Sequence, residues 1–298
     1  MKTGKVYLLA LTAILLWSTA GTAFKLALKG MGFIQLLFIA STTAWIVLGT
    51  VVIARRQTHI LFENPLKNLS RSAIGGFLNP FLYYMVLLKA YTLLPAQLAQ
   101  PLNYTWPVML TILSVIILKK KLKPVDLPAM IISFAGVVVI SSQGQNPFTN
   151  PVSQPLGIIL AVGSSVIWAY YWIFNLSDKR PELIKITLNF FFGSLFSGMT
   201  LLLLGLKLPE PSTHYYPALY VGLTEMAIAF VCWLTALESS ESHAKISNLV
   251  FISPFLALFF IHLILGESIY WTTPVGLVFI TGGILIQQFA GKIKFKRG

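Results

Sequence analysis

Residues 6–28, VYLLALTAILLWSTAGTAFKLAL, contain no charged side chain before Lys25 near their end. A helix of about 20 apolar residues crosses the roughly 30 Å hydrocarbon core of a bilayer, so this stretch predicts a membrane-spanning helix. Similar runs recur along the chain. We expect ten spans, at about 6–28, 31–54, 70–91, 95–118, 125–142, 156–176, 183–206, 215–237, 244–265 and 272–290. The remaining connections are too short for a soluble domain, so the predicted fold class is an all-α polytopic membrane protein.

The composition agrees with this interpretation. Of the 298 residues, 56% are hydrophobic and 10% are charged, and the mean hydropathy is +0.78. Soluble domains carry roughly 25% charged residues, so a soluble enzyme is excluded. The single cysteine, Cys232, excludes an intrachain disulfide. The histidines show no metal-ligand spacing, and a Walker-type phosphate-binding loop is absent from the sequence. We therefore expect no metal, no cofactor and no enzymatic activity.

The net charge of +13 is unevenly distributed between the two sides of the membrane. When the N-terminus is placed in the cytoplasm, only four of the 22 lysines and arginines lie outside: Lys25, Lys29, Lys89 and Lys207. Cytoplasmic loops of membrane proteins are enriched in basic residues, so this asymmetry predicts that both termini are cytoplasmic. Membrane topology then explains the positive net charge, and no nucleic-acid partner is expected. The expected partners are the lipid bilayer and a small-molecule substrate, and the oligomeric state, monomer or homodimer, stays open.

The sequence also contains a weak internal repeat. The matches include Pro107 with Pro254 and Gly136 with Gly283 at an offset of 147, and Trp17 with Trp168 at an offset of 151. Each half has five expected spans, and because five is odd the two halves cross the membrane in opposite senses. This predicts two five-helix inverted-topology repeats, 1–142 and 156–298, around a central cavity. Residues 143–155 are the expected extracytoplasmic linker, and the second half ends in a basic cytoplasmic tail.

One face of the fourth expected span is polar. Its members are three or four residues apart: Gln97, Gln100, Tyr104, Pro107, Thr111 and Ser114. Such side chains lack partners in lipid, so this face should point into the protein. It could line a cavity, or it could supply hydrogen bonds between packed helices. Pro107 deprives the carbonyl of Asn103 of its helical donor and so opens the backbone locally.

Aromatic and polar side chains of other spans extend this set of cavity candidates. Together they are Trp17, Asn79, Tyr83, Tyr84, Gln100, Asn103, Tyr104, Trp168, Tyr171, Trp172, Glu225, Asn248 and Phe251, and the hinge candidates are Pro80, Pro107 and Pro254. For Trp17 and Trp168, plain helix packing is the alternative to substrate contact. An aromatic cavity lacking lysine and arginine would suit ligands with planar bodies and ammonium groups, and would disfavour phosphorylated ones.

Glu225 is the only carboxylate deep within an expected span. An ionisable group inside the membrane is energetically costly, and such groups usually serve a function. Three roles are open for Glu225: coupling transport to protons, pairing with the amino group of a substrate, or a structural hydrogen bond between helices.

The order of these features resembles the EamA family of the drug/metabolite transporter superfamily. The first helix of each half carries a mid-span Trp (LLWSTAGTAFK and VIWAYYWIF), the fourth a Pro (NYTWPVMLTILSVIIL and FISPFLALFFIHLILGES), and the fifth a Gly (SFAGVVVI and TGGILI). The Leu-Gly-Glu usual in the family after the fourth helix is present at 265–267, whereas lysines 119–121 replace it in the first half. Within the family, the sequence is similar to the YddG-type exporters of aromatic amino acids.

The resemblance implies ten helices, a central cavity and export of metabolites across a bacterial inner membrane. We therefore expect a secondary transporter that exports small amphipathic metabolites by alternating access, with the aromatic amino acids Phe, Tyr and Trp as the favoured substrates. A multidrug or other metabolite carrier of the same superfamily, and a channel, are the alternatives.

Overall fold

A computed structural model describes residues 3–61, 65–145, 154–240, 246 and 248–290. Within these residues all regular structure is helical and no strand is present. Eight helical segments are long and apolar enough to cross a membrane, and two further apolar segments, Asp126–Ser141 and Val250–Leu265, are shorter. The protein is therefore an all-helical, multi-pass membrane protein by the length and composition of its helices.

The helices follow the expected spans closely. Up to residue 145 they are α1 (Thr3–Leu28), α2 (Phe33–Ala54), α3 (Thr58–Leu61), α4 (Pro65–Gly76), η1 (Phe77–Leu82), α5 (Tyr83–Leu93), α6 (Ala96–Asn103), α7 (Trp106–Leu118) and α8 (Asp126–Ser141). From residue 154 they are α9 (Pro155–Leu176), α10 (Glu182–Leu203), α11 (Tyr215–Tyr220), η2 (Val221–Ile228), α12 (Ala229–Glu238), η3 (Val250–Ile252), α14 (Ser253–Leu265) and α15 (Thr272–Ala290). The expected linker and the basic tail lie mostly outside the described residues.

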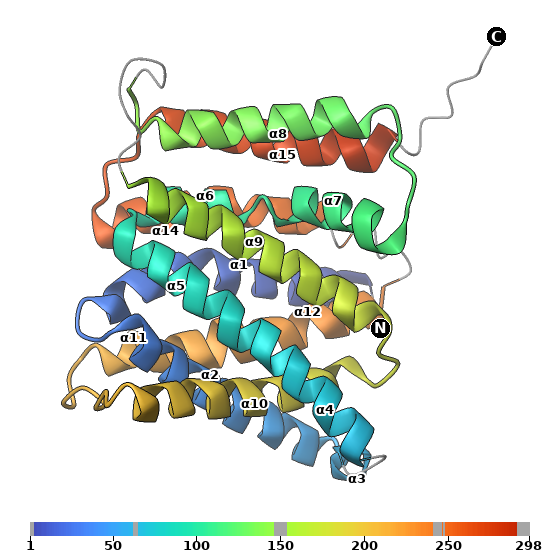
Figure 1. Ribbon diagram of the computed structural model, residues 1–298, viewed down its shortest axis with the longest axis vertical. Helices are drawn as coiled ribbons and strands as arrows, with labels where there is room; N and C mark the ends of the chain where they lie inside the picture. The colour runs from blue at the N-terminus through green and yellow to red at the C-terminus, as the bar shows by residue number, and fades with distance from the viewer. Residues whose placement is uncertain (1–2, 62–64, 146–153, 241–245, 247, 291–298) are drawn as a thin grey trace.

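The helices are stacked in layers, and α9 and the segment formed by α4 and α5 cross the other helices obliquely (Figure 1). α8 and α15 pack together at one edge of the bundle, and α2 and α10 pack together at the opposite edge. Between these edges, α1 packs against α12 and α14, while α9 packs against α5 and α7. The interior between the two edges is therefore enclosed by helices from both parts of the chain.

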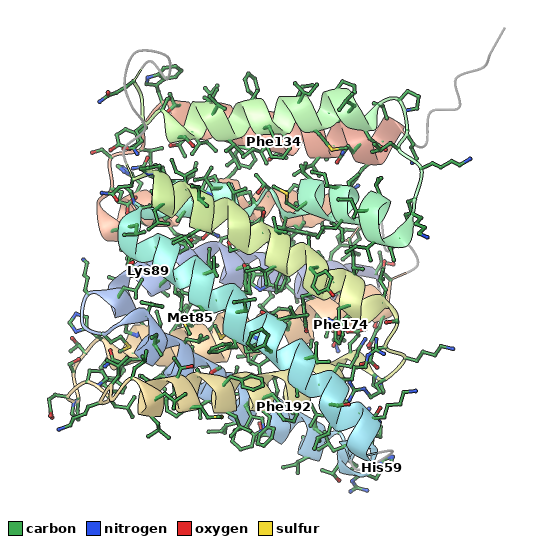
Figure 2. All side chains as sticks on the ribbon, in the orientation of Figure 1. His59, Met85, Lys89, Phe134, Phe174 and Phe192 are labelled. Carbon is green, nitrogen blue, oxygen red and sulfur yellow. The ribbon has the colours of Figure 1, made fainter. Side chains whose placement is uncertain are left out.

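The bundle has two ends that differ in charge. The first turn of α1, the last turn of α15 and residues 119–123 lie at one end, on the right in Figure 1, which we call the lysine end. The opposite end carries the loop between α14 and α15 with Glu267, and we call it the glutamate end. His59 and Lys89, labelled in Figure 2, lie toward the lysine end and the glutamate end respectively.

Glycines let the helices of the α8–α15 layer approach closely. A Cβ built at Gly136 of α8 would lie 2.4 Å from the carbonyl oxygen of Gly276 of α15, and one at Gly276 would lie 2.5 Å from that of Gly136. Small residues at such contacts let helix backbones pack closely within a bilayer. The outward face of α8 instead exposes Leu127, Ile131 and Phe134, an apolar stripe that suits lipid (Figure 2).

Three of the eight long segments and the shorter segment Val250–Leu265 are interrupted. η1 and η2 are π-helical, and Asn79 inside η1 has non-helical dihedrals of φ −147° and ψ 120°. The fourth membrane segment is broken at Tyr104–Thr105 into α6 and α7. The 3₁₀ turn η3 directly precedes α14. The three candidate hinge residues coincide with these irregularities, because Pro80 lies in η1 while Pro107 and Pro254 lie in the first turns of α7 and α14.

A partly buried ionic cluster connects α4 to the segment before α10 at the lysine end. Asp178 lies 3.2 Å from Nε of Arg71 and 2.6 Å from a terminal nitrogen of Arg180, and its side chain is 5% exposed. Burial opposes ionisation of Asp178, but the hydrogen bonds and positive charge of Arg180, together with the charge of Lys185, outweigh burial and hold the carboxyl pKa below its usual range. The Arg71 guanidinium also lies over the ring of Phe174, 5.1 Å from its centroid.

Candidate functional site

A cavity with a volume of about 700 Å³ extends from the middle of the bundle to the lysine end. Its walls come from α1, α5, α6, α7 and α9, and from η2, α12, η3 and α15. Pockets of this size hold small organic ligands. The cavity is therefore a candidate binding site, and its lining reaches the lysine end.

Aromatic rings form the middle of the cavity wall. Trp168 lies 4.8 Å from Tyr83 and 6.2 Å from Phe230, measured between ring centroids. Trp17 continues the wall, 5.8 Å from Phe230 and 5.3 Å from Trp233. Each neighbouring pair joins two different helices, so one aromatic lining connects α5, α9, α12 and α1. Aromatic faces of this kind bind planar groups and attract cations.

Glu225, in the π-helical segment η2, lines the same cavity. Its Oε1 accepts a hydrogen bond from the Tyr84 hydroxyl at 3.1 Å, and its backbone carbonyl accepts one from Trp17 Nε1 at 3.3 Å. Its Oε2 is shielded from solvent and has no hydrogen-bond partner among the described residues. A buried polar atom without a hydrogen-bond partner is destabilising. A proton on this oxygen, or a hydrogen bond donated to it by a ligand, would therefore lower the free energy.

Hydrogen bonds hold the cavity wall in place across helix boundaries. The Tyr83 hydroxyl donates to Asn103 Oδ1 at 3.1 Å, and Asn103 Nδ2 donates to Ser164 Oγ at 2.8 Å. The broken helix near Asn103 is also held by Thr105, whose hydroxyl lies 2.9 Å from that of Ser165. Side chains on both sides of the break are thus hydrogen-bonded to the neighbouring helices α5 and α9.

The cavity is closed toward the glutamate end by packed side chains. Phe24 lies edge-to-face with Tyr91 at 5.2 Å, and the Tyr91 hydroxyl donates to Gln100 Oε1. A Cβ at Gly21 would lie 2.5 Å from that oxygen, so only glycine leaves room for this pair. Lys25 Nζ donates to the Tyr91 carbonyl at 2.8 Å and adds a further contact across the closure.

Comparison with known proteins agrees with this architecture. A family model described as the EamA-like transporter family matches residues 4–142 and 155–287. The chain belongs to this family. Like other members, this EamA-like protein is a membrane transporter, which is consistent with the expectation that it is not an enzyme.

Several relatives of this EamA-like transporter are named as transporters. It is 29% identical to an uncharacterized transporter of Clostridium kluyveri over 98% of this chain and 95% of that protein. It is 24% identical to the aromatic amino acid exporter YddG of Ancylobacter novellus, over 78% of this chain and 79% of that one. Protein PecM of Dickeya dadantii is 25% identical over 75% of each chain. A solved crystal structure shares the fold, with a TM-score of 0.69 at 19% identity over 97% of this chain and 99% of that chain.

Most of the residues expected from the sequence to line a cavity do lie along it in this transporter. They are Trp17, Tyr83, Tyr84, Gln100, Asn103, Tyr104, Trp168, Trp172, Glu225 and Phe251. Asn79, Tyr171 and Asn248 are not among the lining residues. Asn79 is 1% exposed at the kink of η1, and the Tyr171 hydroxyl is paired with the amide group of Asn189. The polar stripe of the fourth span lines the cavity from Gln100 to Ser114, whereas Gln97 bonds to the loop after α14.

The mouth of the cavity differs from the expectation of a site without basic side chains. Lys120, Lys121 and Lys123 line it at the lysine end, beside Gln287 and Gln288 of α15. The expectation holds for the aromatic middle and is wrong for the mouth. The difference arises because residues 119–123, which connect α7 to α8, lie at the mouth of the cavity. Hydropathy alone does not reveal where this connection lies relative to the cavity.

Sequence reasoning missed Phe24, Tyr91, Phe230 and Trp233 as lining residues. Each is an apolar or aromatic residue in an apolar run, so its composition gives no signal of a cavity. Only the packing of α1, α5 and α12 shows which rings face inward. Among the described residues, no group of three His, Cys, Asp or Glu side chains could hold a metal ion.

Proposed function

We propose that this EamA-like transporter exports small amphipathic metabolites that carry an ammonium group, with aromatic amino acids as the favoured substrates, by alternating access. The observation that carries the proposal is a cavity of about 700 Å³ whose middle is aromatic and contains a single carboxylate, Glu225. Aromatic rings favour a planar substrate body, and both the rings and the carboxylate favour a cation. The aromatic amino acid exporter among the relatives supports the same substrate class.

Equivalent irregularities in the two parts of the chain support an inverted repeat. The break after Asn103 lies 147 residues before η3, at Val250. The helix ends at Lys119 and Gly266, also 147 apart, both have left-handed dihedrals. A π-helical segment interrupts the third membrane segment of each part, as η1 and η2. Two matched halves of this kind give a carrier two alternative openings around one site.

The reciprocal packing of helices supports the same proposal. α1 packs on α12 and α14, and its proposed equivalent α9 packs on α5 and α7. A Cβ at Gly75 would meet Asn189 of α10, and one at Gly222, 147 residues later, would meet the carbonyl of Ala40 in α2. On this proposal α8 and the segment Val250–Leu265 are spans as well, which makes ten. The lysine end is then cytoplasmic in a bacterial inner membrane, because basic residues mark that side.

Glu225 is proposed to receive the substrate's ammonium group. Its side chain lines the cavity, and its Oε2 has no partner among the described residues, so a modest side-chain rotation would present this oxygen to a ligand. The neighbouring rings of Tyr84 and Trp17 are already bonded to Glu225, which fixes the position of the residue. Proton coupling through the same carboxylate is the competing role, and transport measurements separate the two.

The test is counterflow of labelled Phe, Tyr and Trp in proteoliposomes, with Glu225→Gln compared with the exposed Glu238→Gln of the same membrane segment. If Glu225 receives the ammonium group, Glu225→Gln raises KM for the amino acids about tenfold or more, because the variant loses a hydrogen bond between two charged groups. The N-acetyl derivatives, which lack the ammonium, should show no such change. If proton coupling is its role, the variant keeps counterflow but loses accumulation driven by a pH gradient.

Two results would contradict the proposal as a whole. Flux that rises linearly with substrate and shows no counterflow would indicate a channel. Preference for organic cations that lack a carboxylate, with no competition by aromatic amino acids, would indicate a multidrug carrier instead. Wild-type kinetics in Glu225→Gln would leave the carrier in place but restrict Glu225 to a structural role.

A further inference from the structure

Glu267 caps a helix that belongs to a distant part of the chain. Its Oε1 accepts a hydrogen bond from the backbone N–H of Ala96 at 2.9 Å, and its Oε2 accepts one from that of Gln97 at 3.1 Å. These N–H groups open α6 and have no partner within that helix. A carboxylate also suits the positive end of the helix dipole. The loop after α14 is thereby fastened to the start of α6.

Gln97 strengthens the same connection. Its Nε2 donates to the carbonyl of Ser268 at 2.8 Å, and its Oε1 accepts the backbone N–H of Tyr270 at 2.8 Å. We call these five residues, Ala96, Gln97, Glu267, Ser268 and Tyr270, the Glu267 clamp. Gln97 is 2% exposed, so its bonds are shielded from water. The clamp spans the glutamate end just beyond the closure formed by Phe24, Tyr91 and Gln100.

The lysine end has a different residue at the position equivalent to Glu267. Lys119 and Gly266 both end their helices in left-handed dihedrals, with φ of 53° and 70°. The next residue is Glu267 in one case and Lys120 in the other. An ammonium group has no lone pair with which to accept a backbone N–H, so Lys120 cannot cap a helix start as Glu267 does. Lys120 is instead exposed and lines the mouth of the cavity.

We propose that the Glu267 clamp holds the empty carrier open toward the lysine end. Substrate is then loaded from this end, and the clamp breaks whenever the carrier opens at the glutamate end. This rests on the proposed alternating access between equivalent halves. A residue that bonds in one state and not in the other shifts the balance between them by its differential free energy. Glu267 bonds in the state described here, and the equivalent Lys120 provides no such bond for the opposite state.

The test measures solvent access to the cavity from each end. Ala20 lines the cavity beneath the closure and is 3% exposed, so Ala20→Cys in a Cys232→Ser background reports opening. A membrane-impermeant cationic thiol reagent is applied to vesicles of each orientation. Control cysteines at Thr92 and Lys123 identify the side that carries the glutamate end and the lysine end. The reporter should react rapidly from the lysine end and slowly from the glutamate end.

Glu267→Gln should make the reporter react about tenfold faster from the glutamate end, since the substitution removes the charge and one acceptor from the pair of capping bonds. Its reaction from the lysine end should slow, because the two open states exclude each other. Gln97→Leu, which keeps the Glu267 bonds, should shift both rates in the same directions by a smaller factor. Glu210→Gln, at an exposed carboxylate of the glutamate end, should leave both rates unchanged.

Two outcomes overturn the clamp. Unchanged rates in Glu267→Gln would show that the bonds do not bias the carrier, and faster reaction from both ends would show a damaged closure instead of a shift between states. Failure of the proposed function has a different signature, because the wild-type protein would then show no counterflow with any amino acid tested. Counterflow with unshifted accessibility would refute the clamp alone.

Discussion

Replacing Gly283 of α15 by alanine should push α15 away from α8, whereas the same substitution at the adjacent Gly282 should not. A Cβ at Gly283 would lie 2.2 Å from Ser133 Oγ and 2.4 Å from the carbonyl oxygen of Ala129, and nothing lies within 4 Å of a Cβ at Gly282. Ordinary contact begins at 3.4 Å, so the two backbones must separate by about 1 Å at Gly283. The Ser133 hydroxyl, which donates to the carbonyl of Ile280 at 3.1 Å, would also have to move.

The magnitude follows from two opposing terms. Overpacking of a closely packed contact costs about 1–3 kcal/mol. Alanine is favoured over glycine within a helix by up to about 1 kcal/mol, and this gain applies at both positions. The difference between the two variants therefore isolates the steric cost. We expect Gly283→Ala to be less stable than Gly282→Ala by about 1–3 kcal/mol.

The assay is the free energy of unfolding in mixed micelles titrated with a denaturing detergent and followed by tryptophan fluorescence. Because the two glycines are neighbours in one helix, effects of expression, detergent and chain length are matched. Equal free energies of unfolding, within about 0.5 kcal/mol, would refute the close approach of α8 and α15 at Gly283.

Two further predictions concern the lysine end and the helix ends. The pKa of Asp178 is lowered because the hydrogen bonds and charge of Arg180, with the charge of Lys185, together outweigh burial. Asp178 therefore stabilises the folded protein above its unfolded pKa of about 4, and this contribution disappears as pH falls through the lower folded pKa. Asp178→Asn should lower the free energy of unfolding by about 1–3 kcal/mol at neutral pH and remove this acid-dependent contribution. The measurement is thermal unfolding of the wild type and the variant between pH 7 and pH 3. Parallel pH profiles of the two proteins would contradict the prediction. Lys119→Gly should raise the free energy of unfolding by about 1 kcal/mol, and Gly266→Ala should lower it by about as much, because left-handed dihedrals cost residues with a Cβ about that amount. A loss of stability in Lys119→Gly would show that the Lys119 side chain contributes more than its backbone costs.

Hydropathy predicted the positions of the helices well. The span expected at 156–176 is α9, Pro155–Leu176, and the span expected at 31–54 is α2, Phe33–Ala54. The hydrocarbon layer contains no water to hydrogen-bond the backbone, so an apolar run must be helical over the length that lies in lipid. The length of the run therefore determines the length of the helix, largely independently of tertiary contacts. The irregularity near Pro107 was also predictable, because proline removes a backbone donor wherever it lies within a helix.

The contacts of Glu225 and Glu267 could not be predicted. Glu225 lies in the π-helical segment η2, where the usual rotation of 100° per residue no longer applies, so a helical wheel cannot give its direction. The sequence revealed Glu267 only as part of a family motif. Its partners at Ala96 and Gln97 are 170 residues away or more, and nothing in the local sequence points to them. Both residues acquire their contacts from tertiary packing.

The shortness of α8 has a consequence for the surrounding lipid. Its 16 residues rise only about 24 Å, less than the roughly 30 Å of a typical hydrocarbon layer. α8 lies at the edge of the bundle, with an exposed apolar stripe. If α8 spans the membrane, as proposed above, its length creates a hydrophobic mismatch that the bilayer would relieve by thinning along this edge. The acyl-chain length of the host membrane thereby becomes part of the energetics of the carrier.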